Sequence, residues 1–147
     1  MNQIELDVRN LKVSFSTPQG NFLAVNGVNF QLHSGETLAL VGESGCGKTV
    51  SALSILKLLP EQSAKITSGE IIFEDRNILS LNTKQMREIR GNKIGMIFQD
   101  PMTSLNPVLT IGEQLSETLL SHKNLNKKEA LKTSAQLLGK VELPNPE

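Results

Sequence analysis

Alternating apolar and polar positions near the N-terminus predict two β-strands. Residues 4–15 and 22–32 both contain such stretches, for example Leu11-Lys12-Val13-Ser14-Phe15, in which every second side chain is apolar. The segment between them, residues 16–21, reads Ser-Thr-Pro-Gln-Gly-Asn and has the composition of a turn. The two runs are therefore expected to pair as antiparallel neighbours.

Short continuous apolar runs further along the chain predict buried strands. They lie at residues 37–41, 69–73 and 93–98. The first and the third are each followed directly by candidate binding residues. Because ligands in open α/β sheets bind beyond the carboxyl ends of the strands, these two strands are expected to deliver their ends to one site.

Helical patterns lie between these strands and take over after Pro107. Residues 50–59 are apolar enough for a buried helix, which should stop before Pro60 because the residue preceding proline disfavours helix. Three further helix starts have the spacing of a capping box: Asn82 with Gln85, Thr110 with Glu113, and Asn126 with Glu129. The change of pattern separates residues 1–107 from a helical stretch over residues 108–147.

A glycine-rich motif stands between the apolar run 37–41 and the predicted helix 50–59. Residues 42–49 read Gly-Glu-Ser-Gly-Cys-Gly-Lys-Thr and fit the phosphate-binding pattern G-x-x-x-x-G-K-[ST]. Strand, glycine loop and helix is the context that this motif requires. A chance glycine turn is disfavoured by the four fixed positions and by both flanks, so the motif predicts nucleotide binding.

Each residue type in the motif has a physical role. Gly42, Gly45 and Gly47 allow backbone angles that a side chain would forbid, and they let the main chain approach the phosphates. Backbone N–H groups and the helix N-terminus then point at the negative charge. Lys48 is placed to reach the β- and γ-phosphates, and the Thr49 hydroxyl is placed to ligate Mg²⁺.

Three further candidates each have a plainer alternative. Gln99 follows the apolar run 93–98 and can ligate Mg²⁺ or orient a water, but it can equally be a loop amide without a ligand. Phe15 can stack on an adenine ring or lie in the core, and Phe22 competes for the same role. Cys46 lies near Lys48 and a helix N-terminus, so a reactive thiol is one interpretation. No base is suggested beside it, so a small residue tolerated in the loop is the favoured interpretation.

Composition narrows the class of protein. The 147 residues include 15 basic and 15 acidic side chains, and no basic arm or patch suggests nucleic acid or an anionic membrane surface. No apolar run approaches the ~20 residues that span a bilayer. The N-terminus lacks the basic and apolar regions of a signal peptide. A single cysteine excludes an internal disulfide, so the composition favours a cytosolic protein.

Two stretches together resemble one protein family. The loop GESGCGKT at residues 42–49, followed by GMIFQDP at residues 95–101, resembles an ABC-transporter ATPase subunit. The longer string QDPMTSLNP, residues 99–107, is similar to the oligopeptide and dipeptide importer branch of that family. FSTPQGNFLAVNGVNF and GEQL, at residues 15–30 and 112–115, point the same way, and the resemblance covers essentially the whole chain.

The resemblance implies a fold and a site. It implies the α/β class, as a P-loop NTPase of the ABC ATPase type. An antiparallel β lobe and a partial parallel core sheet around the phosphate loop would precede the start of a helical subdomain, with the ATP-binding core over residues 1–107. Phe15 would stack on adenine, and Gln99 would sense Mg²⁺ and the γ-phosphate and act with Lys48 in catalysis. The residues that would hold or line the phosphates are Gly42, Glu43, Ser44, Gly45, Cys46, Gly47, Lys48, Thr49 and Val50.

The resemblance also implies partners. They are two integral-membrane permease subunits, a second ATPase subunit and, indirectly, a solute-binding protein, with the ATPase on the cytoplasmic side of a bacterial inner membrane and no nucleic acid bound. The signature loop, the Walker B carboxylates and the switch histidine of the family are absent from these residues. The chain is thus expected to be an N-terminal portion of a longer subunit and inactive by itself. The alternatives are a nucleotide-binding remnant without turnover and an ABC-type ATPase of DNA repair.

Overall fold

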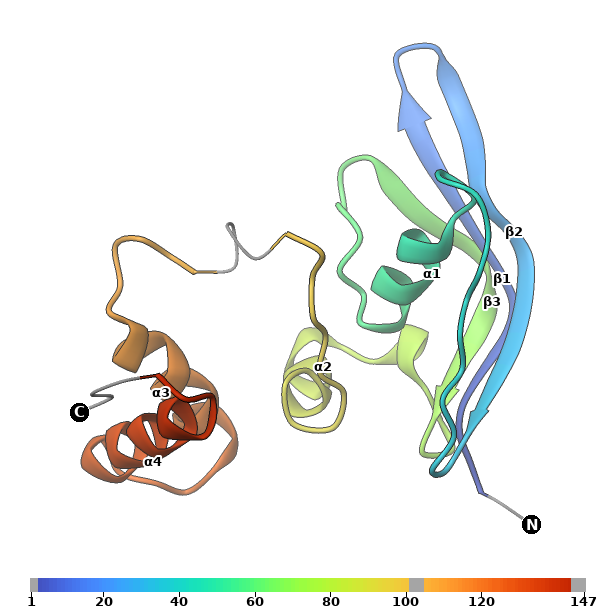
Figure 1. Ribbon diagram of the computed structural model, residues 1–147. Helices are drawn as coiled ribbons and strands as arrows, with labels where there is room; N and C mark the ends of the chain where they lie inside the picture. Colours follow the sequence, from blue (N-terminus) through green and yellow to red (C-terminus); the bar gives the residue numbers. More distant parts are fainter. Residues whose placement is uncertain (1–2, 101–104, 144–147) are drawn as a thin grey trace. The chain divides into compact units, whose positions relative to one another are not determined.

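A four-stranded antiparallel sheet in the order β2-β1-β3-β4 forms the frame of the N-terminal part (Figure 1). The computed structural model describes residues 3–100 and 105–143. The chain divides into two compact units, unit 1 over Met1–Met86 and unit 2 over Arg87–Glu147. The strands, all in unit 1, are β1 (Ile4–Thr17), β2 (Gly20–His33), β3 (Ala64–Phe73) and β4 (Arg76–Asn77).

The strands β1 and β2 form the antiparallel hairpin that the alternating pattern predicts. Their pairing runs from Ile4 opposite His33 to Thr17 opposite Gly20, which leaves only two residues in the turn. The Thr17 hydroxyl donates a hydrogen bond of 2.8 Å to the Gly20 carbonyl and closes this turn. The strands therefore extend further into the segment 16–21 than its turn-like composition suggests.

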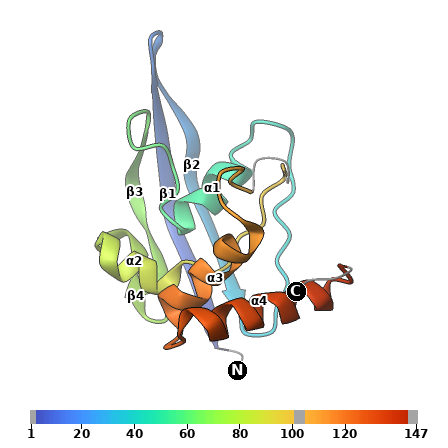
Figure 2. The ribbon, with the colours of Figure 1, turned by 90° about the vertical axis from the view of Figure 1, so that its left-hand side faces the viewer.

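One face of the sheet carries helix α1 (Lys48–Ile55), as both Figure 1 and Figure 2 show. Apolar side chains from the strands, from the C-cap of α1 and from the segment that follows β4 fill the core of unit 1. They include Val8, Leu11, Val13, Val25, Leu56, Ile71, Ile78, Leu81 and Met86. The short 3-10 helix η1 (Ile78–Ser80) begins at Asn77, whose side chain accepts a hydrogen bond from the Leu79 N–H.

Helix α1 ends earlier than Pro60 alone requires. The Leu58 N–H donates to the Leu53 carbonyl and the Lys57 N–H to the Ser54 carbonyl, which is the hydrogen-bond pattern of a Schellman ending. Lys57 occupies the left-handed position of this motif, with φ of 50°. Its ammonium donates to the carbonyls of Leu79 and Leu81 at 3.3 and 2.8 Å, so tertiary contacts stabilise the early end.

All three predicted capping boxes are present. Asn82 and Gln85 exchange the two characteristic hydrogen bonds, at 2.9 and 3.0 Å, at the start of α2 (Thr83–Ile89). In unit 2 the same arrangement opens α3 (Ile111–His122) and α4 (Lys127–Lys140). These bonds satisfy backbone N–H groups that the first helical turn would otherwise leave without a partner.

Helices α3 and α4 pack against each other through small side chains. Ala130 and Ser134 of α4 are buried, as is Ser116 of α3. A Cβ placed on Gly112 would lie 3.2 Å from the Leu131 side chain, tighter than an ordinary contact. Small residues therefore permit the close approach of the two helices.

Two expected strands, residues 37–41 and 93–98, do not form in the described part of the chain. Apart from one isolated bridge between Arg90 and Ile94, neither run pairs with a neighbouring strand there, so the parallel core sheet expected around the phosphate loop is not seen. The run 69–73 does form a strand, as the end of β3. A strand requires partners for its backbone groups. Residues 37–41 are exposed, with Val41 91% accessible, and in the run 93–98 Ile97 is 99% accessible whereas Ile94 and Met96 are half-buried.

Candidate functional site

The phosphate loop lies between the exposed run 37–41 and helix α1. Gly45 and Gly47 have φ of 83° and 92°, a region that side chains rarely adopt. Gly47 is the N-cap of α1, and its carbonyl accepts the first helical hydrogen bond, from the Ser51 N–H at 2.8 Å. The loop thus passes directly into a helix, as the motif requires.

The loop is held against strand β2 at Gly47. A Cβ on this residue would lie 2.5 Å from the Ala24 carbonyl oxygen and 3.1 Å from Cγ2 of Val25. The register of the hairpin shifts here, because Val13 pairs with Val25 whereas Ser14 pairs with Leu23. Ala24 is the extra residue of this bulge, and bulges re-aim a strand locally. Glycine is therefore needed at position 47 for space as well as for conformation.

The Lys48 side chain curls back over the loop that precedes it. Its ammonium donates to the carbonyls of Gly42 and Glu43 at 2.8 and 2.7 Å and lies 3.4 Å from the Cys46 sulfur. These contacts keep a positive charge within the loop instead of in open solvent. An anion bound by the loop would therefore meet a cation already placed beside the backbone.

Helix α1 begins without a side-chain cap. Its N-cap residue makes no capping hydrogen bond, and its first turn contains no acidic residue. In contrast, α2, α3 and α4 each begin with a capping box. The N–H groups of Lys48, Thr49 and Val50 thus remain available at the positive end of the helix dipole, which suits a phosphate group.

Cys46 packs over the first glycine of the loop. A Cβ on Gly42 would approach its sulfur to 2.6 Å. The thiol is free and the residue is exposed. This contact gives Gly42 a packing role that the motif alone does not reveal.

A magnesium ion fits the residues present only if most of its ligands come from elsewhere. Thr49 is the second residue of α1, and it is exposed. Within residues 3–100 and 105–143 no cluster of three His, Cys, Asp or Glu side chains could hold a metal. Mg²⁺ commonly takes one or two protein ligands and completes its shell with phosphates and water, so a single hydroxyl agrees with that chemistry.

The other predicted site residues lie at different places. Phe15 and Phe22, treated as rivals on sequence grounds, are direct partners across β1 and β2. Their rings stack, with centroids 5.7 Å apart and planes inclined by 17°. Gln99 is exposed and belongs to unit 2, whereas the phosphate loop belongs to unit 1. That Gln99 and the phosphate loop form one site therefore stays a prediction.

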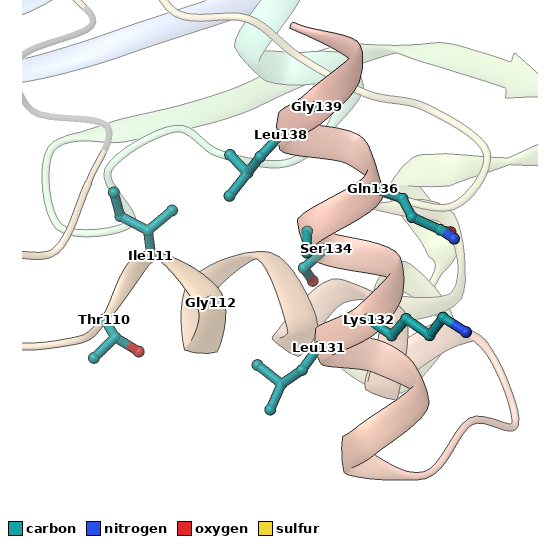
Figure 3. Close-up of a pocket in the computed structure, with 10 residues that line it drawn as sticks. Thr110, Ile111, Gly112, Leu131, Lys132, Ser134, Gln136, Leu138 and Gly139 are labelled. Atoms are coloured by element: carbon teal, nitrogen blue, oxygen red, sulfur yellow. The ribbon is translucent and has the colours of Figure 1, made fainter. Parts of the chain in front are cut away.

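Unit 2 also has a groove, of about 790 Å³, that sequence reasoning did not find. Figure 3 shows Ile111 of α3 and Leu131 and Leu138 of α4 bordering it; Lys132 and Gln136 also line it, although the polar ends of their side chains point away from Leu131 and Leu138. Ile111 and Leu131 are exposed. An apolar groove of this kind suits a protein segment better than a charged nucleotide.

Comparisons with known proteins agree with the loop geometry. A model of the family described as "ABC transporter" matches residues 25–146. The chain is 55% identical over 141 residues to the dipeptide transport ATP-binding protein DppD of Bacillus subtilis, covering 96% of this chain and 42% of that protein. It is 47% identical over 139 residues to the oligopeptide transport ATP-binding protein OppD of Escherichia coli, covering 95% and 41%.

Solved structures show the same fold. A dimeric structure of MJ0796, described as a bacterial ABC transporter cassette, superposes with a TM-score of 0.79 at 25% identity. The match covers 95% of this chain and 58% of that chain, and the same cassette has been solved bound to ADP and Pi. In the described ranges, 3–100 and 105–143, no helix has the length and apolar character that crossing a membrane demands. The family match, the relatives and the phosphate loop ahead of an uncapped helix lead to one conclusion: the chain belongs to the ABC transporter family.

Proposed function

We propose that this chain supplies the phosphate loop of an ATPase subunit that drives peptide import. In this proposal residues 42–50 hold the phosphates of ATP, with Thr49 on Mg²⁺ and Lys48 on the β- and γ-phosphates. The observation that carries it is the uncapped start of α1, reached through a glycine loop that already contains the Lys48 ammonium. Backbone N–H groups, the helix dipole and one cation then converge on one anion.

The contribution of the loop to catalysis is electrostatic. Phosphoryl transfer depends mainly on positioning and on stabilising charge around the γ-phosphate. Donors fixed by the fold need no reorganisation when charge develops, and the close contact of Gly47 with β2 supports that rigidity. Bound Mg²⁺ would neutralise phosphate charge. Gln99 would complete the site by sensing the metal and the γ-phosphate, and Phe15 would stack on the adenine.

The proposal extends to the whole protein. The chain spans about two fifths of the length of the curated relatives it matches, at 42% and 41% for DppD and OppD. We infer that the remaining motifs of the ATPase lie outside these residues, and that residues 1–107 and 108–147 are its nucleotide-binding core and the start of its helical subdomain. The whole protein would pair with a second ATPase subunit against two permease subunits, on the cytoplasmic side of a bacterial inner membrane. Peptides are proposed as the transported solute because both relatives are named for peptide transport.

The groove of unit 2 supports the docking of the helical subdomain on a permease. Its apolar border, formed by Ile111, Leu131 and Leu138, fits a protein segment. A Leu131→Cys variant should cross-link to a permease subunit, and Lys128→Cys, at an exposed position of α4 that does not line the groove, should cross-link less. Cross-links confined to the ATPase subunit itself would show that its own chain covers the groove.

A second function, nucleotide binding without turnover, has one observation in its favour. Apart from the isolated bridge between Arg90 and Ile94, neither the run 37–41 nor the run 93–98 joins a sheet among the described residues, so these residues alone do not form the sheet that would surround the loop. Steady-state phosphate release separates the two functions. The same assay tests the main proposal through Lys48→Ala, with the exposed Lys84→Ala as the matched control. In the whole protein Lys48→Ala should abolish turnover and weaken ATP binding, and unchanged turnover would refute the proposal.

A further inference from the structure

The end of the β1–β2 hairpin carries two stacked aromatic rings, although stacking on an adenine requires only one. Phe15 and Phe22 are opposite partners in the register, and cross-strand partners share a face of the sheet. Their rings are nearly parallel, with centroids 5.7 Å apart. Phe22 is 52% exposed and Phe15 is half-buried. The Phe22 ring thus covers one face of the Phe15 ring although Phe22 itself is largely exposed.

The pair lies on the same face of the sheet as the phosphate loop. In β1, Val13 and Phe15 are two residues apart, so their side chains point to the same side. Val13 is buried and pairs with Val25, whose side chain lies next to Gly47 of the loop. Phe22 is three positions before Val25, and the extra residue Ala24 between them keeps both side chains on one face of the sheet. The rings therefore lie on the face of the sheet that the loop contacts at Val25, two residues along β1 from its partner Val13.

We propose that Phe22 is a positioning residue for the nucleotide base. This inference rests on the proposed function, in which Phe15 stacks on the adenine of ATP. By covering one face of Phe15, Phe22 restricts the rotation of that ring and leaves the opposite face for the base. Phe22 acts through Phe15, so its contribution depends on the Phe15 ring and on the presence of a base in the ligand.

The test is a double-mutant cycle in the whole protein, with ATP and inorganic tripolyphosphate as the two ligands. Aromatic pairing of ordinary strength predicts that Phe22→Ala raises the dissociation constant for ATP about threefold to tenfold. Phe22→Leu, which keeps bulk without a ring, should show most of this loss, and Phe22→Tyr should show little. Affinity for tripolyphosphate and kcat should stay unchanged, because neither depends on the base.

In the Phe15→Ala background, Phe22→Ala should have no further effect on ATP binding. Losses that multiply, or a larger loss for Phe22→Ala than for Phe15→Ala, would make Phe22 an independent contact and overturn the inference. An equal loss of tripolyphosphate affinity would show damage to the loop and would overturn it too. The Lys48→Ala variant keeps the two proposals apart. If it binds both ligands normally, the proposed function fails, whereas a normal Phe22→Ala beside a defective Lys48→Ala refutes only the role of Phe22.

Discussion

Replacing Gly47 by alanine tests whether the phosphate loop is fixed by its contact with β2. The new Cβ would stand 2.5 Å from the Ala24 carbonyl oxygen, whereas ordinary contacts begin at 3.4 Å. The loop and the strand would have to separate by ~0.9 Å, which the closely packed interior resists. Gly45→Ala is the matched control, because Gly45 also has a positive φ, of 83°, but nothing lies within 4 Å of its Cβ position.

The expected magnitudes follow from this difference. A side chain in the left-handed region costs about 1–2 kcal/mol, and both variants share this penalty. Overpacking against a rigid neighbour costs a further ~1–3 kcal/mol, which only Gly47→Ala incurs. Gly47→Ala should therefore lower the free energy of unfolding by about 2–5 kcal/mol and Gly45→Ala by about 1–2 kcal/mol.

Urea unfolding of the nucleotide-free whole protein measures the total loss in the free energy of unfolding. Hydrogen exchange shows which part of the structure is destabilised. The Ser51 amide, which bonds to the Gly47 carbonyl, should exchange about tenfold faster or more in Gly47→Ala than in Gly45→Ala. Equal destabilisation by the two substitutions would refute the reasoning, because strain alone would then explain both.

Four further predictions address the site and the fold. Bound Mg-ATP should protect Cys46 from a maleimide, and prior alkylation should block ATP binding; equal labelling rates, with binding confirmed separately, would contradict this placement. Gln99→Ala in the whole protein should lower transport-coupled hydrolysis while ATP affinity changes by less than about tenfold, or ~1.4 kcal/mol; lost binding with normal coupling of the residual activity would exclude that role. Hydrogen bonds from the backbone N–H and then the hydroxyl of Thr110 lower the pKa of Glu113 below its usual 4.5, so the carboxylate should stabilise α3 above that pH and lose its effect as the pH falls through the lowered pKa. Glu113→Gln should remove this dependence from the helicity of α3, and an unchanged acid transition would assign it to another group. Residues 1–147 expressed alone should be marginally stable or insoluble, bind ATP weakly at best and release no phosphate; a monomer that melts cooperatively and hydrolyses ATP would show that these residues suffice.

The sequence predicted those features of the structure that depend on residues close together in the chain. Each capping box is defined by two residues three positions apart, such as Thr110 and Glu113, and all three formed. The phosphate loop likewise depends on backbone angles that Gly45 and Gly47 make available within one short segment. The family was predicted from the phosphate loop together with the string QDPMTSLNP, residues 99–107, and the comparisons confirmed the family and the α/β class.

Features that need a distant partner were predicted less well. The run 37–41 has strand composition, yet composition does not supply the neighbour that a strand requires. The contact of Gly47 with Ala24 depends on a bulge in another element, which no local pattern marks. The pairing of Phe15 with Phe22 follows from the two-residue turn between Thr17 and Gly20, which fixes that register, but the turn-like composition of residues 16–21 does not define where the turn begins and ends.

The two-residue turn of the β1–β2 hairpin has a consequence for the order in which the chain folds. Pairing between Thr17 and Gly20 closes a very short loop, and each later pair extends it by one step as far as Ile4 and His33. Every residue of this hairpin precedes the phosphate loop in the chain, so during synthesis the hairpin leaves the ribosome first. A hairpin by itself is only marginally stable, and it gains its third neighbour when β3 pairs with β1. The surface around Ala24 can therefore begin to form before Gly47 is synthesised, but it becomes stable only with β3, which follows the loop in the chain, so the loop and β3 would settle onto the hairpin together.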